Sequence, residues 1–588
     1  MMNNNMKAII TALLMTATAV HASSDNSGDY ALDRIEAFSK IANLVEFYHP
    51  SESVQATDWE QFSKYGAHYI QQNTSQDFAS QLKYLFNEVA PHVTFNDYLT
   101  EPERLREHDK VSGWINLGYP SKLGHYSFRR EVNTINYGQL HTEPFLPQQQ
   151  VYYAQLNGVY VRVPMLLEAN KTAKDGGAYI VPAHVNIPDT LENPFYCFSV
   201  MSKVWGVMAH FGQYFHHVPV NWGAELRPLL SVCQTQDARK IENALKYTLT
   251  KLQDNHVYLY LRDVPAARYW PDVGFEMVEG KPVLIYKGSK VDELEVGDEL
   301  VAVDGQDIRT LINEKIPYSL SAANTAASDV LGNEVLLREN PTDTVTLDIV
   351  NRDNQPYSVQ LVTDKLRYES YYNTIDNYTH SSQATHQVLD KHIHYLDLSK
   401  VTNEALPGLM KKLETARGII VDLRNYPSDW FAWQNFLTSI HDGKIEGPVY
   451  KIRVSNHPDY EQRHVFNLDL SRQGTSQRLN KPMVVLSSRY SISRNEFVLA
   501  FFQNLNIPVV GEATKGINGD LTYVLYGDVP YHLAIGFTGA EVRQADGSKL
   551  IGVGVQPDIL VSPTLDDIRN NHDTIKDTAK KYLETLIQ

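Results

Sequence analysis

The 588-residue sequence is poor in cysteine, with Cys197 and Cys233 as its only two. Neither belongs to a Cys-X-X-Cys pair or lies beside a histidine-rich tract, so a metal site built on thiolates has little support. In an oxidising compartment two cysteines within one sub-domain can form a disulfide. The alternative is a pair of buried free thiols. The sequence leaves both states of this pair open.

Beyond its first residues, the sequence also lacks a long apolar run. Residues 1–22 combine Lys7, the apolar stretch 8–20 and the small residue Ala22, a pattern typical of a cleaved secretory signal. No later stretch is apolar enough to predict a membrane helix. We therefore expect a signal peptide at residues 1–22 and a mature protein that is soluble and secreted, most simply into the periplasm.

A basic stripe and a glycine-rich phosphate loop are missing as well. The formal net charge of −16 is spread along the chain, which argues against nucleic acid or an anionic membrane as partner. Without a phosphate loop there is no sign of a nucleotide, and we expect no cofactor. The oligomeric state is not indicated.

The length predicts about three or four domains. Apolar residues at helical spacing predict a helical unit over 28–105 and a second one over 196–262. The two units share landmarks in one register, such as Lys40 before Trp59 and Lys203 before Trp222, which predicts an internal duplication. Between them, alternating runs separated by Gly and Pro predict a β-rich segment over 110–195.

Short strands and turns dominate residues 268–364. The stretch 296–305 places a Gly-Asp turn before an apolar strand that ends in an Asp-Gly hairpin turn. This segment resembles a PDZ domain of bacterial proteases, and the resemblance implies binding of an extended peptide at a sheet edge. A small barrel with a Gly-Asp turn is the structural alternative.

Strands alternate with helices over residues 365–564, which predicts parallel strands joined by crossover helices. In such sheets the active site lies beyond the carboxyl ends of the strands. The tail over 565–588 has the pattern of one amphipathic helix.

Ser493 is the strongest candidate for a nucleophile. It follows the strand 482–486 and directly precedes a helix, where a side chain is exposed at the sheet edge and helix N–H groups face a developing oxyanion. The alternative is a structural role, in which Ser493 caps the helix and Glu496 completes a capping box.

Three motifs in order favour the catalytic interpretation: residues 418–424 (Gly-Ile-Ile-Val-Asp-Leu-Arg), 491–516 around Ser493 with Val-Val-Gly-Glu-Ala-Thr-Lys-Gly, and 552–558 (Gly-Val-Gly-Val-Gln-Pro-Asp). Together they resemble the tail-specific (C-terminal-processing) and tricorn-type serine peptidases, over about residues 198 to 588. The resemblance implies a multi-domain α/β fold, with an α/β peptidase core, a PDZ-like β module and duplicated helical N-terminal units around the β-rich segment.

The same resemblance points to the general base. In the C-terminal-processing branch this is a lysine, whose position is occupied here by Asn518, with Lys515 three residues away. In the tricorn-type branch it is the histidine of an Asp-x-His motif, which Asp254-Asn255-His256 matches. We therefore expect His256 to act as the base, since an imidazole works near neutral pH. A purely structural histidine in the helical unit is the alternative.

Two positions depart from the family pattern. Ile551 stands where tricorn-type enzymes often have a glutamate that orients the histidine, and nothing selects between Glu541 and Asp546 as a substitute. The oxyanion-hole segment Gly-Asn-x-Gly-Gly is replaced by residues 425–429, in which Pro427 has no N–H to donate. The backbone N–H groups of Arg494 and Asn425 remain the expected oxyanion donors, with Tyr426 as an alternative to Asn425.

His216 and His217 form a further polar pair, while carboxylate pairs such as Asp566-Asp567 in the tail are expected to be solvated. Adjacent side chains on a helix or strand point apart, and no third ligand stands at a fitting spacing, so no metal site is predicted. The sequence thus predicts a secreted or periplasmic serine endopeptidase acting on protein or peptide substrates through an acyl-enzyme. A catalytically silent PDZ-containing protein that binds peptides or acts as a scaffold is the alternative.

Overall fold

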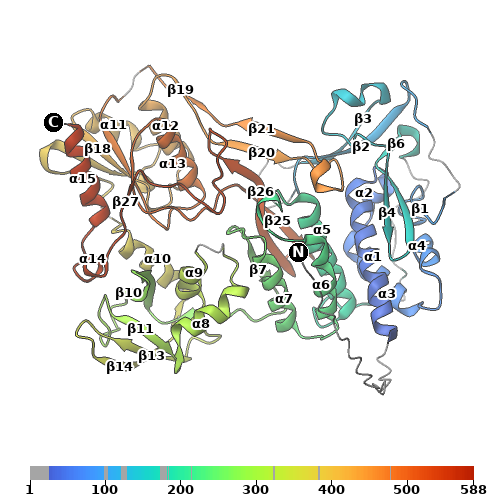
Figure 1. The fold of residues 1–588 in the computed structure, drawn as a ribbon, viewed down its shortest axis with the longest axis horizontal. Coiled ribbons are helices and arrows are strands. Elements are labelled where there is room, and N and C mark those ends of the chain that lie inside the picture. Colours follow the sequence, from blue (N-terminus) through green and yellow to red (C-terminus); the bar gives the residue numbers. More distant parts are fainter. Residues whose placement is uncertain are drawn as a thin grey trace, which may run out of the picture.

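The computed structural model describes residues 26–98, 104–120, 129–172, 182, 185–213, 215–321, 325–381, 384–476 and 479–587. The predicted signal peptide lies outside these residues. Among them, no helix is both long and apolar enough to cross a lipid bilayer. The helical units and the β-rich segment between them form one half of the molecule. The α/β domain and the module over 268–364 form the other half (Figure 1).

The helical units begin at polar caps and pack into one apolar cluster. Asp58 accepts hydrogen bonds from the N–H groups of Glu60 and Gln61, and Asn193 caps a later helix in the same way. The helices are α1 (Asn26–Tyr48), α2 (Glu52–Ala56), α3 (Trp59–Gln72), α4 (Phe78–Phe86), α5 (Pro194–Phe211), α6 (Leu226–Cys233) and α7 (Ala238–Thr250). Helix α5 packs against α1, α3 and α6, so both predicted units share a single core.

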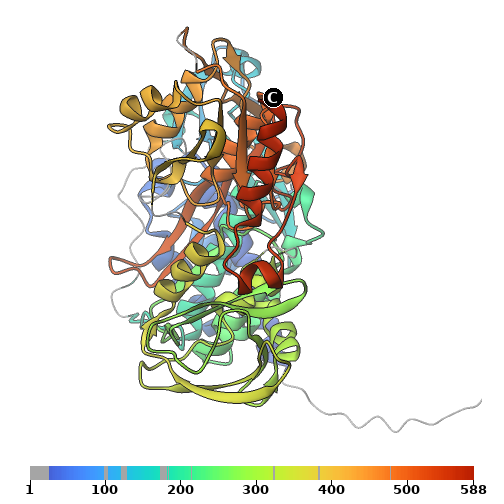
Figure 2. The ribbon, with the colours of Figure 1, turned by 90° about the vertical axis from the view of Figure 1, so that its left-hand side faces the viewer.

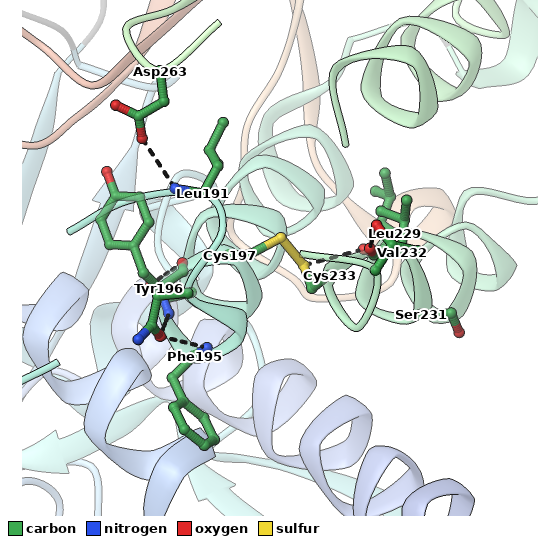
Figure 3. The surroundings of a disulfide bond; sticks show 12 residues. Leu191, Phe195, Tyr196, Cys197, Leu229, Ser231, Val232, Cys233 and Asp263 are labelled. Carbon is green, nitrogen blue, oxygen red and sulfur yellow. Dashed lines mark hydrogen bonds between the residues drawn. A yellow bond between two sulfur atoms is a disulfide. The ribbon is translucent and has the colours of Figure 1, made fainter. Parts of the chain in front are cut away.

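A disulfide joins Cys197 of α5 to Cys233 of α6, with their Cα atoms 5.6 Å apart (Figure 3). Both cysteines are fully buried within the helical cluster. Of the two states that the sequence left open, the structure has the disulfide.

Between the helical units the chain forms short antiparallel sheets. The first has the strand order β1-β5-β4 and the second β3-β2-β6. Their strands are β1 (Thr94–Phe95), β2 (Lys110–Asn116), β3 (Arg130–Asn136), β4 (Val151–Leu156), β5 (Val159–Pro164) and β6 (Leu166–Glu168). The predicted β-rich character of 110–195 is thus present in its described residues.

Residues 268–364 fold into an antiparallel sheet of order β14-β13-β11-β10-β9 with two helices. Asp304 and Gly305 both have positive φ, of 50° and 78°, and form the tight turn between β11 and β12. The elements are β8 (Tyr269–Trp270), β9 (Val273–Val278), β10 (Lys281–Lys287), β11 (Glu299–Val303), β12 (Gln306–Asp307), α8 (Ile308–Lys315), α9 (Ala326–Asn333), β13 (Thr344–Val350), β14 (Pro356–Val362) and β15 (Lys365–Leu366). This module lies below the α/β domain in Figure 2.

The α/β domain is built on a sheet of order β16-β17-β18-β23-β24-β27, parallel except for β16. Its strands are β16 (His386–Val388), β17 (Ile393–Asp397), β18 (Gly418–Asp422), β23 (Met483–Ser487), β24 (Val509–Gly511) and β27 (Ile559–Leu560). The helices of this domain are α11 (Leu406–Leu413), α12 (Trp430–Ser439), α13 (Arg494–Asn504), α14 (Leu565–Arg569) and α15 (Thr574–Leu586). Helix α10 (Arg367–Tyr378) precedes them and packs against β9 and β10 of the module over 268–364.

Both faces of this sheet are covered. Ile419 and Val421 of β18 point into the core formed with α11, α12 and α13, whereas Ile420 between them packs with residues of α15. This alternation explains why the strand is apolar throughout. The predicted parallel α/β arrangement is therefore present.

A β-ribbon links the α/β domain to the helical units (Figure 1). It has the order β21-β20-β26-β25, and β7 from the second helical unit pairs with β26. The strands are β7 (Tyr258–Leu261), β20 (Val449–Arg453), β21 (Val465–Asp469), β25 (Asp520–Tyr526) and β26 (Leu533–Arg543), with the short pair β19 (Lys444–Ile445) and β22 (Arg472–Gln473) beside it. The pairing of β7 with β26 fixes the Asp254–His256 turn to the domain that carries Ser493.

The prediction of one helix over 565–588 is wrong, because the tail forms α14 and α15 as two separate helices. Asn571 between them has a φ of 52°, a left-handed conformation that ends a helix. Asp573 then starts α15 by accepting a hydrogen bond from the N–H of Lys576.

Candidate active site

Ser493 occupies the turn between β23 and α13 in an unusual backbone conformation. Its φ and ψ are 52° and −108°, a combination that non-glycine residues rarely adopt. The N–H of Ser493 donates a hydrogen bond of 2.6 Å to the carbonyl of Ile517. The Ser493 side chain makes no capping hydrogen bond to α13. The helix-cap alternative is therefore wrong, and the strained turn leaves the hydroxyl for another role.

Glu496 does not complete a capping box either. Its carboxylate is fully buried and accepts hydrogen bonds from the Thr514 hydroxyl at 2.6 Å and the N–H of Gly516 at 2.5 Å. Burial raises the pKa of Glu496 to about 7, while the hydrogen bonds oppose this shift. Glu496 thus holds the segment after β24 against the helix that begins at the nucleophile.

His256 lies in the turn before β7, and its ring is oriented by a residue of β26. His256 Nδ1 lies 2.7 Å from Thr538 Oγ1, and that hydroxyl lies 2.9 Å from Asp254 Oδ1. Asp254 also accepts hydrogen bonds from the N–H groups of His256 and Thr538, at 3.0 and 2.7 Å. The histidine therefore bonds across the domain boundary, which contradicts a purely internal role in the helical unit.

The direction of the hydrogen bonds determines the tautomer of His256. An ionised Asp254 can only accept, so the Thr538 hydroxyl donates to it and its oxygen accepts from the N–H at Nδ1 of His256. The lone pair of neutral His256 is then on Nε2. Burial lowers the pKa of His256, although the charges of Asp254 and Asp520 act to raise it. A neutral imidazole with a lone pair on Nε2 is the form that a general base requires.

Ser493 and the His256 turn contact the same stretch of chain. Ser493 bonds to Ile517, as described above, and Asn255 Nδ2 donates to the carbonyl of Lys515 at 3.5 Å. The segment 515–517 thus forms a structural link between the two candidate catalytic residues.

Lys515 is unsuited to serve as the base. Its ammonium group is buried and forms an ion pair with Asp329 of α9. Burial acts to lower the pKa of Lys515, but the charge of Asp329 raises this pKa above its ordinary value. Asn518, at the position of the lysine in the C-terminal-processing branch, is buried and has no basic group.

The loop at the predicted oxyanion hole is held by the two residues that follow Ser493. Arg494 Nη1 donates to the carbonyls of Pro427 and Ser428, at 2.9 and 2.8 Å. Asn495 Nδ2 donates to the carbonyl of Asn425 at 2.7 Å. The first N–H groups of a helix lack partners within it, and Arg494 occupies the first position of α13. These contacts fix the loop next to the start of α13 without the glycines of the family pattern.

Comparisons with known proteins relate part of this chain to a peptidase family. Residues 392–561 match the family model "Peptidase family S41". This part of the chain is a family S41 serine peptidase domain. The resemblance to tail-specific and tricorn-type peptidases is thereby confirmed, and the chain is a serine-type peptidase. No curated protein sequence matches the chain at a significant level.

Among solved structures, one protease has a similar overall fold and two others have weaker likenesses. Mature CPAF complexed with lactacystin has a TM-score of 0.53 at 13% identity, over 66% of this chain and 96% of that chain. The photosystem II D1 C-terminal processing protease has a TM-score of 0.34 at 15% identity, over 64% of this chain and 97% of that chain. The tricorn protease has a TM-score of 0.32 at 12% identity, over 82% of this chain and 46% of that chain. At these identities the likeness to CPAF shows a shared fold alone.

A cavity of about 290 Å³ separates the S41 domain from the module over 268–364. Its lining includes Asp329 of α9, Tyr371 of α10, Thr514, Lys515 and Val553. The cavity therefore adjoins the segment that connects to Ser493.

Neither proposed substitute for the missing glutamate contacts His256. Glu541 is bound by His217 and Arg543, each at 2.7 Å, and Asp546 lies in an exposed turn after β26. Ile551 itself is buried. Thr538, which does bond to His256, was not found from the sequence, because a threonine in a strand carries no motif.

The sequence argument against a cluster at His216 and His217 is also wrong. The two rings lie with their centroids 3.9 Å apart, because the pair sits in the tight 3₁₀ turn η3 (Phe215–His217). Glu541, remote in sequence, approaches both of them.

Proposed function

We propose that the chain is a secreted or periplasmic endopeptidase that cleaves protein substrates through an acyl-enzyme on Ser493. The observation that carries this proposal is the backbone of Ser493, with a φ of 52° and a ψ of −108° at a strand-to-helix turn. Strained conformations of this kind are kept where the surrounding structure over-determines them, often at active sites. The turn presents the hydroxyl beyond the carboxyl end of β23, where α/β sheets place their sites.

His256 is the general base of this mechanism. Its Nε2 accepts the proton of the Ser493 hydroxyl as the oxygen attacks the carbonyl carbon of the scissile bond, and it returns the proton to the leaving amine. Water then attacks the ester while Nε2 accepts one of its protons, and that proton passes to Ser493 Oγ as the ester C–O bond breaks and the carboxylic acid product leaves. The N–H groups of Arg494 and Asn425 stabilise the oxyanion in both halves of the reaction.

Thr538 and Asp254 take the place of the orienting glutamate. The imidazolium that forms during the attack donates from Nδ1 to Thr538 Oγ1, whose own proton points to Asp254. The carboxylate therefore stabilises the positive ring through one hydroxyl. This arrangement explains how Ile551 can replace a glutamate without loss of the base.

The module over 268–364 is proposed to act as a PDZ-like peptide-binding domain. Its antiparallel sheet ends at β9 and β14, and an extended segment of substrate can add to an open edge. The cavity between this module and the S41 domain lies beside segment 515–517. The Cys197–Cys233 disulfide supports an oxidising location.

The test is the Ser493→Ala variant, compared with wild type in cleavage of an unfolded protein and in labelling by a serine-reactive fluorophosphonate probe. We expect both activities to be lost while the melting temperature stays within a few degrees of wild type. Ser548→Ala, at an exposed serine in a turn, is the matched control and keeps both activities. Wild type that takes no label and cleaves no unfolded protein would support the silent peptide-binding protein instead.

A further inference from the structure

Three polar side chains outside the catalytic centre converge at the end of the β-ribbon. His216 and His217 come from η3, and Glu541 comes from β26. Their ligand atoms all lie within 4.8 Å of one another. His217 Nε2 is 2.7 Å from Glu541 Oε1, and His216 Nε2 is 3.5 Å from Glu541 Oε2. Both rings thus aim the same nitrogen at one carboxylate.

The hydrogen bonds of His216 leave a lone pair facing that carboxylate. The Tyr460 hydroxyl donates to the carbonyl of Gln213 at 2.7 Å, so its oxygen accepts from His216 Nδ1, also at 2.7 Å. In the neutral ring Nε2 is then an acceptor, and it points toward a second acceptor, Glu541 Oε2. Two acceptors in this arrangement repel each other unless a positive charge lies between them.

The carboxylate is well prepared to hold such a charge. The side chain of Glu541 is only 1% exposed. Its oxygens face His216 Nε2 and His217 Nε2, and Arg543 Nε donates a hydrogen bond to Oε1 at 2.7 Å. A carboxylate buried in this way needs a positive partner, and a metal ion held by the two imidazoles would supply one.

We propose that His216, His217 and Glu541 form a binding site for one divalent transition-metal ion of the Zn²⁺ type. Two imidazoles and one carboxylate are a ligand set that Zn²⁺ favours, with water completing the tetrahedron. His216 is exposed, so water reaches the open position. Tyr460 fixes the tautomer of His216 and holds its ring, as outer partners of metal-binding histidines do.

The position of the site gives the ion a structural effect. η3 belongs to the second helical unit, whereas β26 belongs to the ribbon of the S41 domain and also carries Thr538. A bound ion would cross-link these two parts in the neighbourhood of the strand that orients His256. The metal therefore has a structural role in this proposal, and no step of peptide hydrolysis passes through it.

Arg543 competes with a metal ion for two of the three ligands. Its Nε donates to Glu541 Oε1 at 2.7 Å, and its Nη2 lies 3.1 Å from His217 Nε2. The guanidinium neutralises Glu541 and must leave His217 before that nitrogen can bind a metal. Arg543 is half-buried and its Nη1 contacts the carbonyl of Gly547 in an exposed turn, so it has room to move.

The experiment is a titration of the untagged, chelator-treated full chain with Zn²⁺, followed by calorimetry, and with Co²⁺, followed by its visible absorption. We expect one ion per chain and the intense d–d bands of a low-coordinate Co²⁺ site. His217→Ala and His216→Ala should abolish the one-to-one binding and the bands. Tyr460→Phe should weaken binding by about tenfold or more, as loss of an outer partner does, and Arg543→Gln should tighten it.

Exposed His141 lies outside the cluster, and His141→Ala is the matched control that keeps full binding. Melting temperatures without metal show whether each variant is folded. Failure of wild type to bind one ion, or equal loss of binding in His141→Ala and His217→Ala, overturns the proposal and leaves an ion-pair cluster. Because the readout is binding to the whole chain, the result is independent of whether Ser493 is catalytic.

Discussion

His256 and Thr538 are 282 residues apart in the sequence and are joined by a 2.7 Å hydrogen bond between Nδ1 and the threonine hydroxyl. The histidine belongs to the helical half of the molecule and the threonine to the ribbon of the S41 domain. The bond exists because β7, which follows His256, pairs with β26 in a register that sets Tyr258 opposite Gly536. Docking of the two parts therefore determines the orientation of the proposed base.

We expect Thr538→Val to lower kcat/KM, because the valine methyl group removes the acceptor for the Nδ1 proton while keeping the shape of the side chain. General base catalysis contributes roughly 10²–10⁴-fold, so the loss should be about tenfold to a hundredfold. Most of it should appear in kcat, since Thr538 does not touch the substrate.

Thr538→Ser is the matched control and should retain at least about half of the activity. A pH profile of kcat/KM provides a readout that a merely structural role would not move. Equal activity in the valine and serine variants would show that the hydroxyl does not orient His256.

The buried carboxyl of Glu496 should make the stability of the protein depend on pH. Its pKa is about 7 in the folded state and near 4.5 when unfolded, so the folded state binds more protons between these values. The stability associated with Glu496 is complete below about pH 4.5 and is lost as the pH rises through about 7. The loss should reach on the order of 3 kcal/mol.

This prediction is checked by chemical denaturation of wild type and Glu496→Gln from pH 5 to pH 8. The difference between the two free energies of unfolding should move in favour of the glutamine variant as the pH rises. Glu461→Gln, at an exposed glutamate, is the control, and its free energy of unfolding should change with pH in the same way as that of wild type. A constant difference between wild type and Glu496→Gln would refute a raised pKa.

Lys515 should prove to be a structural cation and not a base. Lys515→Arg keeps the positive charge beside Asp329, and the cavity of about 290 Å³ that Lys515 lines has space for the larger guanidinium. An arginine does not deprotonate in proteins, so it cannot serve as a base. We expect the variant to keep at least about half of the peptidase activity.

Lys515→Met, in contrast, leaves Asp329 buried without a partner and should destabilise the protein by about 3–5 kcal/mol. Asp329→Asn in the same chain should restore much of this loss. Complete inactivity of a folded Lys515→Arg variant would instead assign the role of base to the lysine.

Reduction of the Cys197–Cys233 disulfide should destabilise the helical cluster. The bond closes a loop with a sequence separation of 36, for which the loss of chain entropy predicts about 3–4 kcal/mol. Intact mass with and without a thiol-alkylating reagent shows whether the bond is present. The melting temperature of the Cys197→Ala/Cys233→Ala variant should be lower than that of the oxidised protein and unaffected by reductant.

Much of the catalytic domain was predictable because its signals are local. The alternation of apolar strands and helices over 365–564 reflects a parallel sheet covered on both faces, and the structure has that sheet. Ser493 was placed at a strand-to-helix turn from adjacent residues alone. The break in the tail at Asn571 was missed, because the apolar spacing continues across a residue that leaves the helical conformation.

The residues around the candidate site were harder to predict from the sequence. Thr538 and Glu541 lie on one strand, yet one orients His256 and the other binds His217 and Arg543, and neither carries a motif. The adjacent histidines were expected to point apart, which holds for regular helices and strands but not for the 3₁₀ turn that they occupy.

The parallel α/β core, the nucleophile turn and the candidate base could be predicted from the sequence, because each depends on residues that are neighbours in the chain. The orientation of His256, the neutralisation of Lys515 and the cluster around His216 could not, because they depend on contacts between distant segments. These contacts include the pairing of β7 with β26 and the ion pair of Lys515 with Asp329 of α9. Long-range hydrogen bonds and ion pairs of this kind depend on tertiary contacts, so no local pattern specifies them.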